Sequence, residues 1–445
     1  MPKITHRKKR LSSFKLIVLG FAGVIVLGAL ILMLPFSSTA GVVTPFHEAL
    51  FTSTSAVCVT GLVVQDTGSY WSAFGQTVIL LMIQIGGLGV VTVAAFFAML
   101  SGRKISLMQR STMQDAISAP KVGGIVRLTR FIVRGTFLIE LIGMIVMLPT
   151  FCGNFGIKGI WMAAFHSISA FCNAGFDILG TAENKYPSLT GYIGNPAINI
   201  TIMLLIIVGG IGFLTWDDIY TNKWHFKKYR MQSKVILVTT AILIIAPAVF
   251  FFFCDFTGLP LAERILASLF QSVTPRTAGF NTADLPDMTG SSKAIMTLLM
   301  LVGGSPGSTA GGMKTTTLAV LILSAFSVCR KKDDAEVCGR RIDGSTVKNA
   351  AAVAVMYFLL FFVGGIVIST AEGLPLSTCL YETASAVGTV GLTLGITPQL
   401  GVLSQLILIV LMYLGRVGGL TLIYAAISNK NQSGAKLPLE KITVG

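Results

Sequence analysis

The sequence contains few charged residues. Only 12% of its 445 residues are charged, while 53% are hydrophobic and the mean hydropathy is +0.77. Ordinary soluble domains have about 25% charged residues. This composition excludes a water-soluble enzyme, a disordered chain and a fibrous repeat protein.

Motifs that bind metals or phosphates, or that carry catalysis, are also scarce. The seven cysteines form no C-x-x-C pair and the four histidines are scattered, so neither a zinc site nor a disulfide framework is indicated. The chain has no G-x-x-x-x-G-K-[ST] phosphate-binding motif and no H-E-x-x-H motif. We therefore expect that the protein is not an enzyme and that any nucleotide acts only through a separate partner.

Long apolar segments are abundant instead. A helix needs roughly 20 apolar residues to cross a bilayer. Basic residues gather before the first such segment, in 101–134, 221–234 and 330–348, and in the C-terminal tail, all on one side if there are eight spans. The positive-inside rule makes that side the cytoplasm, with both termini there, so the net charge of +15 reflects topology rather than nucleic-acid binding. The eight expected spans lie near 14–36, 76–100, 131–152, 197–216, 235–254, 292–326, 349–370 and 401–427.

One short pattern occurs four times at nearly equal spacing. It reads S-A-V-C-V-T-G-L at 55–62, S-A-F-C-N-A-G-F at 169–176, V-T-P-R-T-A-G-F at 273–280 and S-A-V-G-T-V-G-L at 385–392. Fixed-period repeats indicate a repeated structural unit. The pattern divides the chain into four units: 1–100, 101–220, 221–327 and 328–445.

Before each repeated stretch lies a moderately apolar segment that is too short to span, at 44–57, 158–171, 261–274 and 376–387. A half-length helix followed by a return to the same side is a re-entrant loop, which persists at membrane depth only when it is buried in protein or lines water. We therefore predict an all-α polytopic membrane protein. It has four tandem helix–pore-loop–helix repeats around one pseudo-fourfold central pore, with eight transmembrane helices and four re-entrant half-helices.

The repeated stretches contain no carboxylates, which disfavours a filter for divalent ions made of acidic side chains. Rings of backbone carbonyls can replace the hydration shell of a monovalent cation. The residues three positions before each glycine differ in type, so we expect the backbone rather than the side chains to bind the ion. We expect the one arginine among them, Arg276, to point away from the axis and brace its loop. These residues are Cys58, Cys172, Arg276 and Gly388.

The sixth apolar segment contains a helix-breaking run, G-G-S-P-G-S-T-A-G-G at 303–312. Each interior glycine costs about 1 kcal/mol and proline about 3 kcal/mol relative to alanine. We expect the helix to open over 303–317 and to form a gate below the filter; a static kink is the alternative. The expected gate residues are Gly303, Gly304, Ser305, Pro306, Gly307, Ser308, Thr309, Ala310, Gly311, Gly312 and Lys314.

Arg416 lies within the last apolar segment. A buried arginine costs at least ~2.5 kcal/mol on the insertion scale and normally faces a cavity or a partner. Three arrangements remain open: an electrostatic barrier facing the pore, donation to carbonyls of 303–312, or a pair with Glu140.

Four such units in one chain resemble the superfamily of Trk, Ktr and HKT potassium transporters, and most closely its KtrB and KtrD membrane subunits. The aligned glycines, the T-A-G-F-N run at 277–281 and the break at 303–312 carry the resemblance, which covers nearly all of the chain. By position it implies that the filter, which holds K+ at backbone carbonyls, also includes Val59, Thr60, Gly61, Asn173, Ala174, Gly175, Thr277, Ala278, Gly279, Thr389, Val390 and Gly391.

The resemblance also implies partners and a location. It implies a homodimer with one pore per monomer in a bacterial cell membrane, Na+ as an activator, and a cytosolic ring of nucleotide-binding RCK subunits of the KtrA or KtrC type. The competing hypothesis from the residues is an alternating-access transporter of another cation or small solute, because such carriers also contain repeats and broken helices. Carriers usually show two repeats, whereas four like-oriented repeats favour one axial pore.

Overall fold

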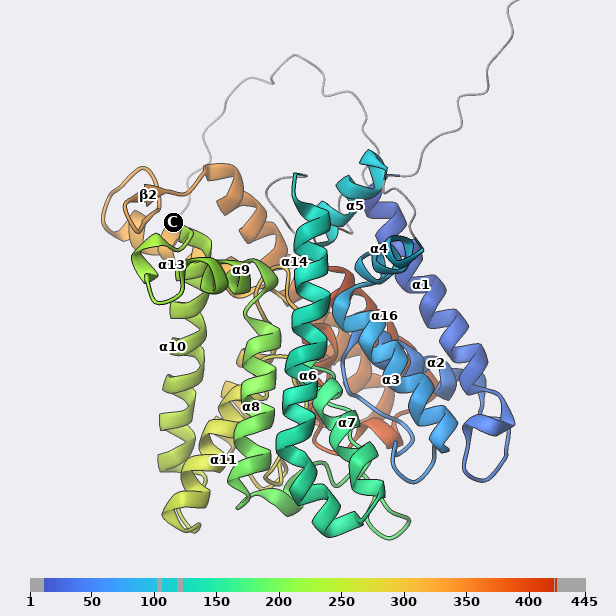
Figure 1. Ribbon diagram of the computed structural model, residues 1–445. Coiled ribbons are helices and arrows are strands. Elements are labelled where there is room, and N and C mark those ends of the chain that lie inside the picture. Colours follow the sequence, from blue (N-terminus) through green and yellow to red (C-terminus); the bar gives the residue numbers. More distant parts are fainter. Residues whose placement is uncertain (1–11, 102–105, 118–122, 420, 422–445) are drawn as a thin grey trace, which may run out of the picture.

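The computed structural model describes residues 12–101, 106–117, 123–419 and 421, and it consists almost entirely of helices (Figure 1). Among the described residues, four helices are long and apolar enough to cross a membrane, one in each of the four repeats. The all-α membrane fold is thus confirmed. These helices are α1 (Ser13–Leu32), α6 (Ile125–Phe155), α10 (Met231–Cys254) and α14 (Gly344–Glu372).

A short helix follows each long one and agrees with the predicted half-helix to within two residues. In every repeat a hydroxyl of the short helix donates to a main-chain carbonyl of the long helix. In the first repeat Ser53 donates to Ile25, at 2.7 Å, and the other three bonds are 2.5–3.0 Å long. The same bond therefore docks all four half-helices. They are α2 (Phe46–Cys58), α7 (Lys158–Phe171), α11 (Leu261–Val273) and α15 (Leu376–Gly388).

Apolar helices occupy the predicted spans over 76–100 and 197–216, but in both repeats the helix is broken by a sharp bend. α3 (Ala73–Leu88) and α4 (Val90–Leu100) meet at 95°, and α8 (Pro196–Gly210) and α9 (Phe213–Asn222) at 98°. The bends lie at Gly89 and Gly212, which have nearly the same backbone angles (φ 85° and 91°, ψ 134° and 140°). Both arms of each bend are apolar, so hydropathy alone does not reveal the break.

The later repeats have related breaks. In the third repeat a loop over 302–314 separates α12 (Gly290–Leu301) from α13 (Thr315–Cys329). The predicted opening is present, but the helix resumes at Thr315 rather than after 317. In the fourth, α16 (Val402–Val417) ends at Gly418 with φ 86° and ψ 139°, and most of the predicted continuation to 427 lies outside the described residues.

The segments predicted to be cytoplasmic gather at one end of the molecule, at the top of Figure 1, while α7 and α11 lie toward the other end. The end with the predicted cytoplasmic segments carries α5 (Leu107–Ile117), which the sequence analysis missed. It also carries a hairpin of β1 (Glu336–Val337) and β2 (Arg340–Arg341). The basic arm over 1–11 and the tail beyond 421 lie outside the described residues. Single-turn helices complete the connections: η1 (Pro35–Ser37), η2 (Thr190–Tyr192), η3 (Phe226–Lys228) and η4 (Thr397–Gln399).

Candidate functional site

The chain after each half-helix adopts an unusual backbone conformation. Two residues before the aligned glycine, a residue with a side chain has a left-handed conformation, and three of these four residues are β-branched. Such conformations cost about 1–3 kcal/mol each and persist only where the surroundings enforce them. The four residues are Val59 (φ 58°), Asn173 (φ 59°), Thr277 (φ 66°) and Thr389 (φ 52°).

Each aligned glycine also has a positive φ, between 67° and 96°, while the residue between has a negative φ. Alternating left- and right-handed residues turn successive amide groups to one side, and hence successive carbonyls to the other. Three consecutive carbonyls per loop therefore have a common direction.

These carbonyls have no protein partner. Within the part of the chain that the structure describes, none of the twelve carbonyl oxygens in 59–61, 173–175, 277–279 and 389–391 accepts a hydrogen bond. All of these residues except the partly exposed Gly61 are buried, and Val59 is the most exposed of the non-glycine residues at 1%. Since buried backbone carbonyls are normally paired, these oxygens are available to a ligand or to water.

The four loops form a closed ring. A Cβ atom added to Gly61 would meet the carbonyl of Ala174, and one added to Gly175 would meet the carbonyl of Ala278. In the same way a Cβ atom added to Gly279 would meet the carbonyl of Val390, and one added to Gly391 would meet the carbonyl of Thr60. The fourth loop therefore contacts the first. The loops therefore meet in chain order around one axis, and each glycine is required both by its backbone angle and by this close approach.

Hydrogen bonds from the half-helices support the ring. The amide N–H groups of Thr60, Ala174 and Val390 donate to the carbonyls of Ser55, Ser169 and Ser385, each at 2.8 Å. The hydroxyls of Ser55 and Ser385 accept from the glycine amides of their loops at 3.0 Å. These bonds use the amide groups of the first and fourth loops and leave their carbonyls free. The sequence analysis missed these serines. An alignment of the four repeats shows a serine at this position in three of them, Ser55, Ser169 and Ser385.

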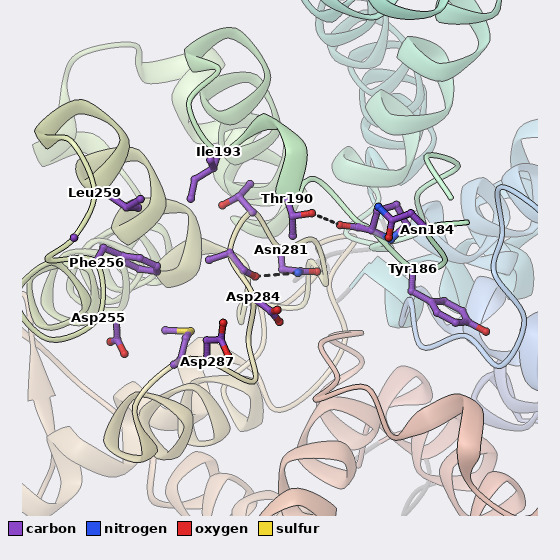
Figure 2. Close-up of a pocket in the computed structure, with 15 residues that line it drawn as sticks. Asn184, Tyr186, Thr190, Ile193, Asp255, Phe256, Leu259, Asn281, Asp284 and Asp287 are labelled. Carbon is purple, nitrogen blue, oxygen red and sulfur yellow. Dashed lines mark hydrogen bonds between the residues drawn. The ribbon is translucent and has the colours of Figure 1, made fainter. Parts of the chain in front are cut away.

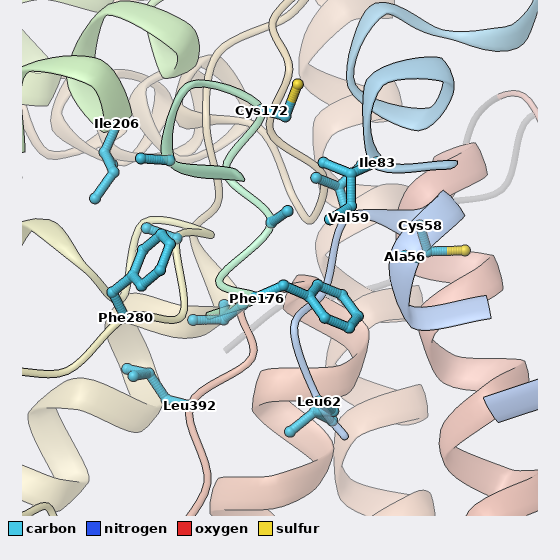
Figure 3. Close-up of a cluster of buried hydrophobic side chains, with 14 of the residues drawn as sticks. Ala56, Cys58, Val59, Leu62, Ile83, Cys172, Phe176, Ile206, Phe280 and Leu392 are labelled. Carbon is cyan, nitrogen blue, oxygen red and sulfur yellow. The ribbon is translucent and has the colours of Figure 1, made fainter. Parts of the chain in front are cut away.

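Side chains of the ring are packed into protein, as Figure 3 shows. Cys58 and Cys172 lie behind their loops, and both are fully buried. The apolar residues that follow the glycines, among them Leu62 and Phe280, are also fully buried. Arg276 reaches α10, where it donates to Oγ1 of Thr240 at 3.2 Å. Backbone therefore forms the inner surface of the ring.

The loop over 302–314 lies against the base of the ring. Cβ atoms added to Gly303 and Gly311 would meet the side chains of Thr277 and Thr389. The loop is also bonded to the breaks of neighbouring repeats: the Ser305 amide donates to the Gly210 carbonyl at 2.9 Å. Three further amide groups donate to carbonyls in the same way: Phe213 to Gly307 at 2.7 Å, Thr309 to Gly209 at 3.2 Å and Gly312 to Gly415 at 3.3 Å.

Arg416 connects this loop to the first repeat. One guanidinium nitrogen donates to the carbonyl of Thr309 and another to the carbonyl of Gly86, with a longer bond of 3.3 Å to Gly87. The pairing with Glu140 that we considered is wrong: Glu140 accepts from Gln84 at 3.0 Å, and no ion pair joins it to Arg416 among the described residues. Glu140 lies behind the second loop instead, where its Oε1 is 3.9 Å from Sγ of Cys172.

A cavity of about 230 Å³ lies directly below the loop, on the side of α5. Arg416 and Lys314 line it together with Gly307, Ser308 and Asp115. Lys314 donates to the carbonyls of Ala310 and Gly311, at 2.8 and 3.4 Å, so it is bound within its own loop. The loop thus separates the ring from a hollow on the basic side.

The opposite side of the ring is acidic. A cavity of about 720 Å³ between the second and third repeats carries Asp255, Asp284 and Asp287, with Asn184 and Tyr186 across from them (Figure 2). This face would raise the local concentration of cations near the ring.

Comparison with known proteins identifies relatives of the whole chain. Residues 13–434 match the model of the cation transport protein family TrkH. The potassium/sodium uptake protein NtpJ of Enterococcus hirae is 38% identical over 450 residues, which cover 98% of each chain. The Ktr system potassium uptake protein B of Bacillus subtilis is 36% identical over 439 residues, which cover 97% of this chain and 96% of that protein.

A solved structure has the same fold. The crystal structure of the potassium transporter TrkH from Vibrio parahaemolyticus is 19% identical and superposes with a TM-score of 0.75, over 96% of this chain and 87% of that chain. The resemblance drawn from the four repeats is thereby confirmed, and the chain is a multi-pass membrane protein. It belongs to the TrkH family of cation transport proteins.

Proposed function

We propose that this chain is the ion-translocating membrane subunit of a potassium uptake system. The observation that carries the proposal is the closed ring of four loops with twelve unpaired carbonyl oxygens. Carbonyl rings of this kind replace the hydration shell of K+. The proposal agrees with the names of relatives that are described as potassium uptake proteins of the Ktr system.

The loop over 302–314 acts as the gate of this pore, with Lys314 and Arg416 as its cationic side chains. Four main-chain bonds to the second and fourth repeats and the bond from Arg416 to Thr309 support this role, because breaking them would free the loop to move. The alternating-access mechanism is disfavoured, since the loops close a ring of four rather than pairing as two halves.

We further propose the assembly and setting that the family resemblance implies. The chain forms a homodimer with one pore per subunit in the bacterial cell membrane, with its basic end and both termini in the cytoplasm. A cytosolic ring of nucleotide-binding RCK subunits of the KtrA or KtrC type controls the gate, and Na+ activates transport. Nucleotide binds only to the partner.

Flux measurements on the purified protein in liposomes test the proposal. Potassium-selective flux, measured with K+ and Na+ in parallel and then with the cytosolic partner and ATP or ADP, is the expected result. Gly61→Ser and Gly391→Ser should lower the discrimination between K+ and Na+ about tenfold or more, because a side chain displaces the neighbouring carbonyl of the ring.

Gly23→Ser is the matched control, since a Cβ at this glycine of α1 meets nothing within 4 Å. Unchanged selectivity in both ring variants would falsify the filter assignment. Saturable exchange of another solute without potassium permeation would instead favour alternating access.

A further inference from the structure

The third loop contains a buried cation without a countercharge. Arg276 is 3% exposed. Among the described residues its side chain donates one hydrogen bond, to Thr240, and its Nε has no partner. No carboxylate of the described residues lies within ion-pair distance of it. A guanidinium stays protonated in proteins, so this loop carries a fixed positive charge.

The acidic side chains near the other loops are engaged elsewhere and form no ion pair with Arg276 among the described residues. Glu140, behind the second loop, is bound to Gln84, and its Oε1 lies 3.9 Å from Sγ of Cys172. Glu382 of α15 accepts from the hydroxyls of Thr393, at 2.9 Å, and Thr397.

Helix α11 explains how a cation is tolerated here. The helix ends at Val273, and the amide of Arg276 donates to the Val273 carbonyl at 3.1 Å. The C-terminal end of a helix carries partial negative charge, which favours a cation there. The main chain of Arg276 therefore lies at an end of a helix where positive charge is tolerated.

A fixed charge acts on ions in proportion to their valence. At an effective dielectric constant of about 20, a unit charge roughly 10 Å away changes the occupancy of a site about tenfold for a monovalent ion and more than a hundredfold for a divalent ion. Conduction also requires that ions be held weakly enough to leave. Ba2+ has nearly the same radius as K+ but twice its charge, so a fixed positive charge beside the ring discriminates between the two ions by valence.

Resting on the proposed function, we infer that Arg276 is a specificity-determining residue that excludes divalent cations from the ring. Its charge makes the carbonyls poor ligands for Ba2+ and similar ions, and it acts through the field rather than by contact with the ion. The other three loops have Cys58, Cys172 and Gly388 at this position, so one arginine supplies the charge for the whole ring.

Block of K+ flux by external Ba2+, measured in liposomes, tests this inference. Arg276→Gln removes the charge and should lower the half-blocking Ba2+ concentration at least about tenfold, with a smaller fall in the K+ concentration for half-maximal flux. Thr240→Asp keeps the arginine but gives it a countercharge, and it should shift the block in the same direction. Arg276→Lys retains the charge and should remain within about twofold of the parent.

Thr240→Val separates charge from packing, because it removes the hydrogen bond to Arg276 and leaves the charge. The half-blocking Ba2+ concentration of this variant should equal that of the parent. The inference is overturned if Thr240→Val shifts the block as far as Arg276→Gln, or if Arg276→Gln and Thr240→Asp both conduct K+ with parental block. Should Arg276→Gln fail to fold, Thr240→Asp decides alone. Loss of K+ flux in the parent protein would instead refute the proposed function.

Discussion

At the scale of single residues, the ring depends on backbone conformation more than on side-chain chemistry. Val59, Thr277 and Thr389 hold left-handed angles that β-branched residues rarely adopt. The loops of Val59 and Thr389 are bonded to their half-helices at both amide and hydroxyl groups, which holds these angles. Side chains in equivalent positions are therefore free to differ, as Cys58 and Arg276 do.

One acidic side chain just outside the ring leads to a prediction of pH dependence. Asp177 lies two residues after Gly175; burial raises its pKa to about 7, and the neighbouring carboxylate of Asp66 adds to the rise. Above pH 7 this carboxyl is ionised and attracts cations; below pH 7 it is neutral. We expect the K+ concentration for half-maximal uptake to fall about two- to tenfold between external pH 6 and pH 8.

Asp177→Asn should remove this dependence and keep the weaker, low-pH value throughout. Asp284→Asn, which removes an exposed carboxylate from the same face, should leave the pH dependence in place. Uptake kinetics at several external pH values, with the internal pH clamped, provide the measurement. A pH profile that survives in Asp177→Asn would assign the titration to another group.

At the scale of elements, the four second helices are variants of one broken helix. Gly89, Gly212 and Gly418 share one backbone conformation, and the third repeat replaces this single glycine by the loop over 302–314. Two positions before Gly418 stands Arg416, where the first two repeats have Gly87 and Gly210. The fourth repeat thus places a long cation where the first two repeats have glycines that face the side chains of Cys172 and Asn173.

Arg416 either clamps the loop or repels ions, and two substitutions separate these roles. Hydrogen bonds to a charged group contribute about 1.5–3 kcal/mol each, so losing them should raise the open population at least tenfold. Arg416→Ala should therefore increase K+ leak without the cytosolic partner. Lysine keeps the charge but not the forked geometry. Arg416→Lys should leak like alanine if the clamp dominates, and like the parent if repulsion dominates.

Flux in liposomes without partner subunits measures this leak. Shortening the loop by deleting 305–312 should raise the leak as well, because the contacts to Gly209 and Gly210 are lost. A closed-state leak that stays at the parental level in both Arg416→Ala and the deletion would show that the loop is not the gate.

The sequence predicts some of these elements well and others poorly. The half-helices were located to within two residues because apolar segments of that length are too short to span. The breaks at Gly89 and Gly212 were missed because apolar residues continue on both sides, and α5 was missed because it is a polar helix inside a basic segment. Choosing the partners of Arg416 required the packing of three repeats, which no local pattern contains.

At the scale of the whole molecule, native cysteines allow the orientation to be tested. Cys254 is exposed at the end of α10, toward the acidic side, and Cys338 is exposed in the β1–β2 hairpin on the basic side. Because basic segments stay in the cytoplasm, a membrane-impermeant maleimide should reach Cys254 from outside the cell and Cys338 from inside. Labelling of right-side-out and inverted vesicles measures both.

In right-side-out vesicles, Cys254→Ser should reduce labelling and Cys338→Ser should leave it unchanged. Inverted vesicles should show the opposite, since the hairpin then faces the reagent. Cys58, Cys172 and Cys379 are buried and should contribute to neither pattern. The reverse assignment would place the acidic cavity in the cytoplasm, where it could not concentrate cations for uptake, and the loop over 302–314 would then close the outer side of the ring.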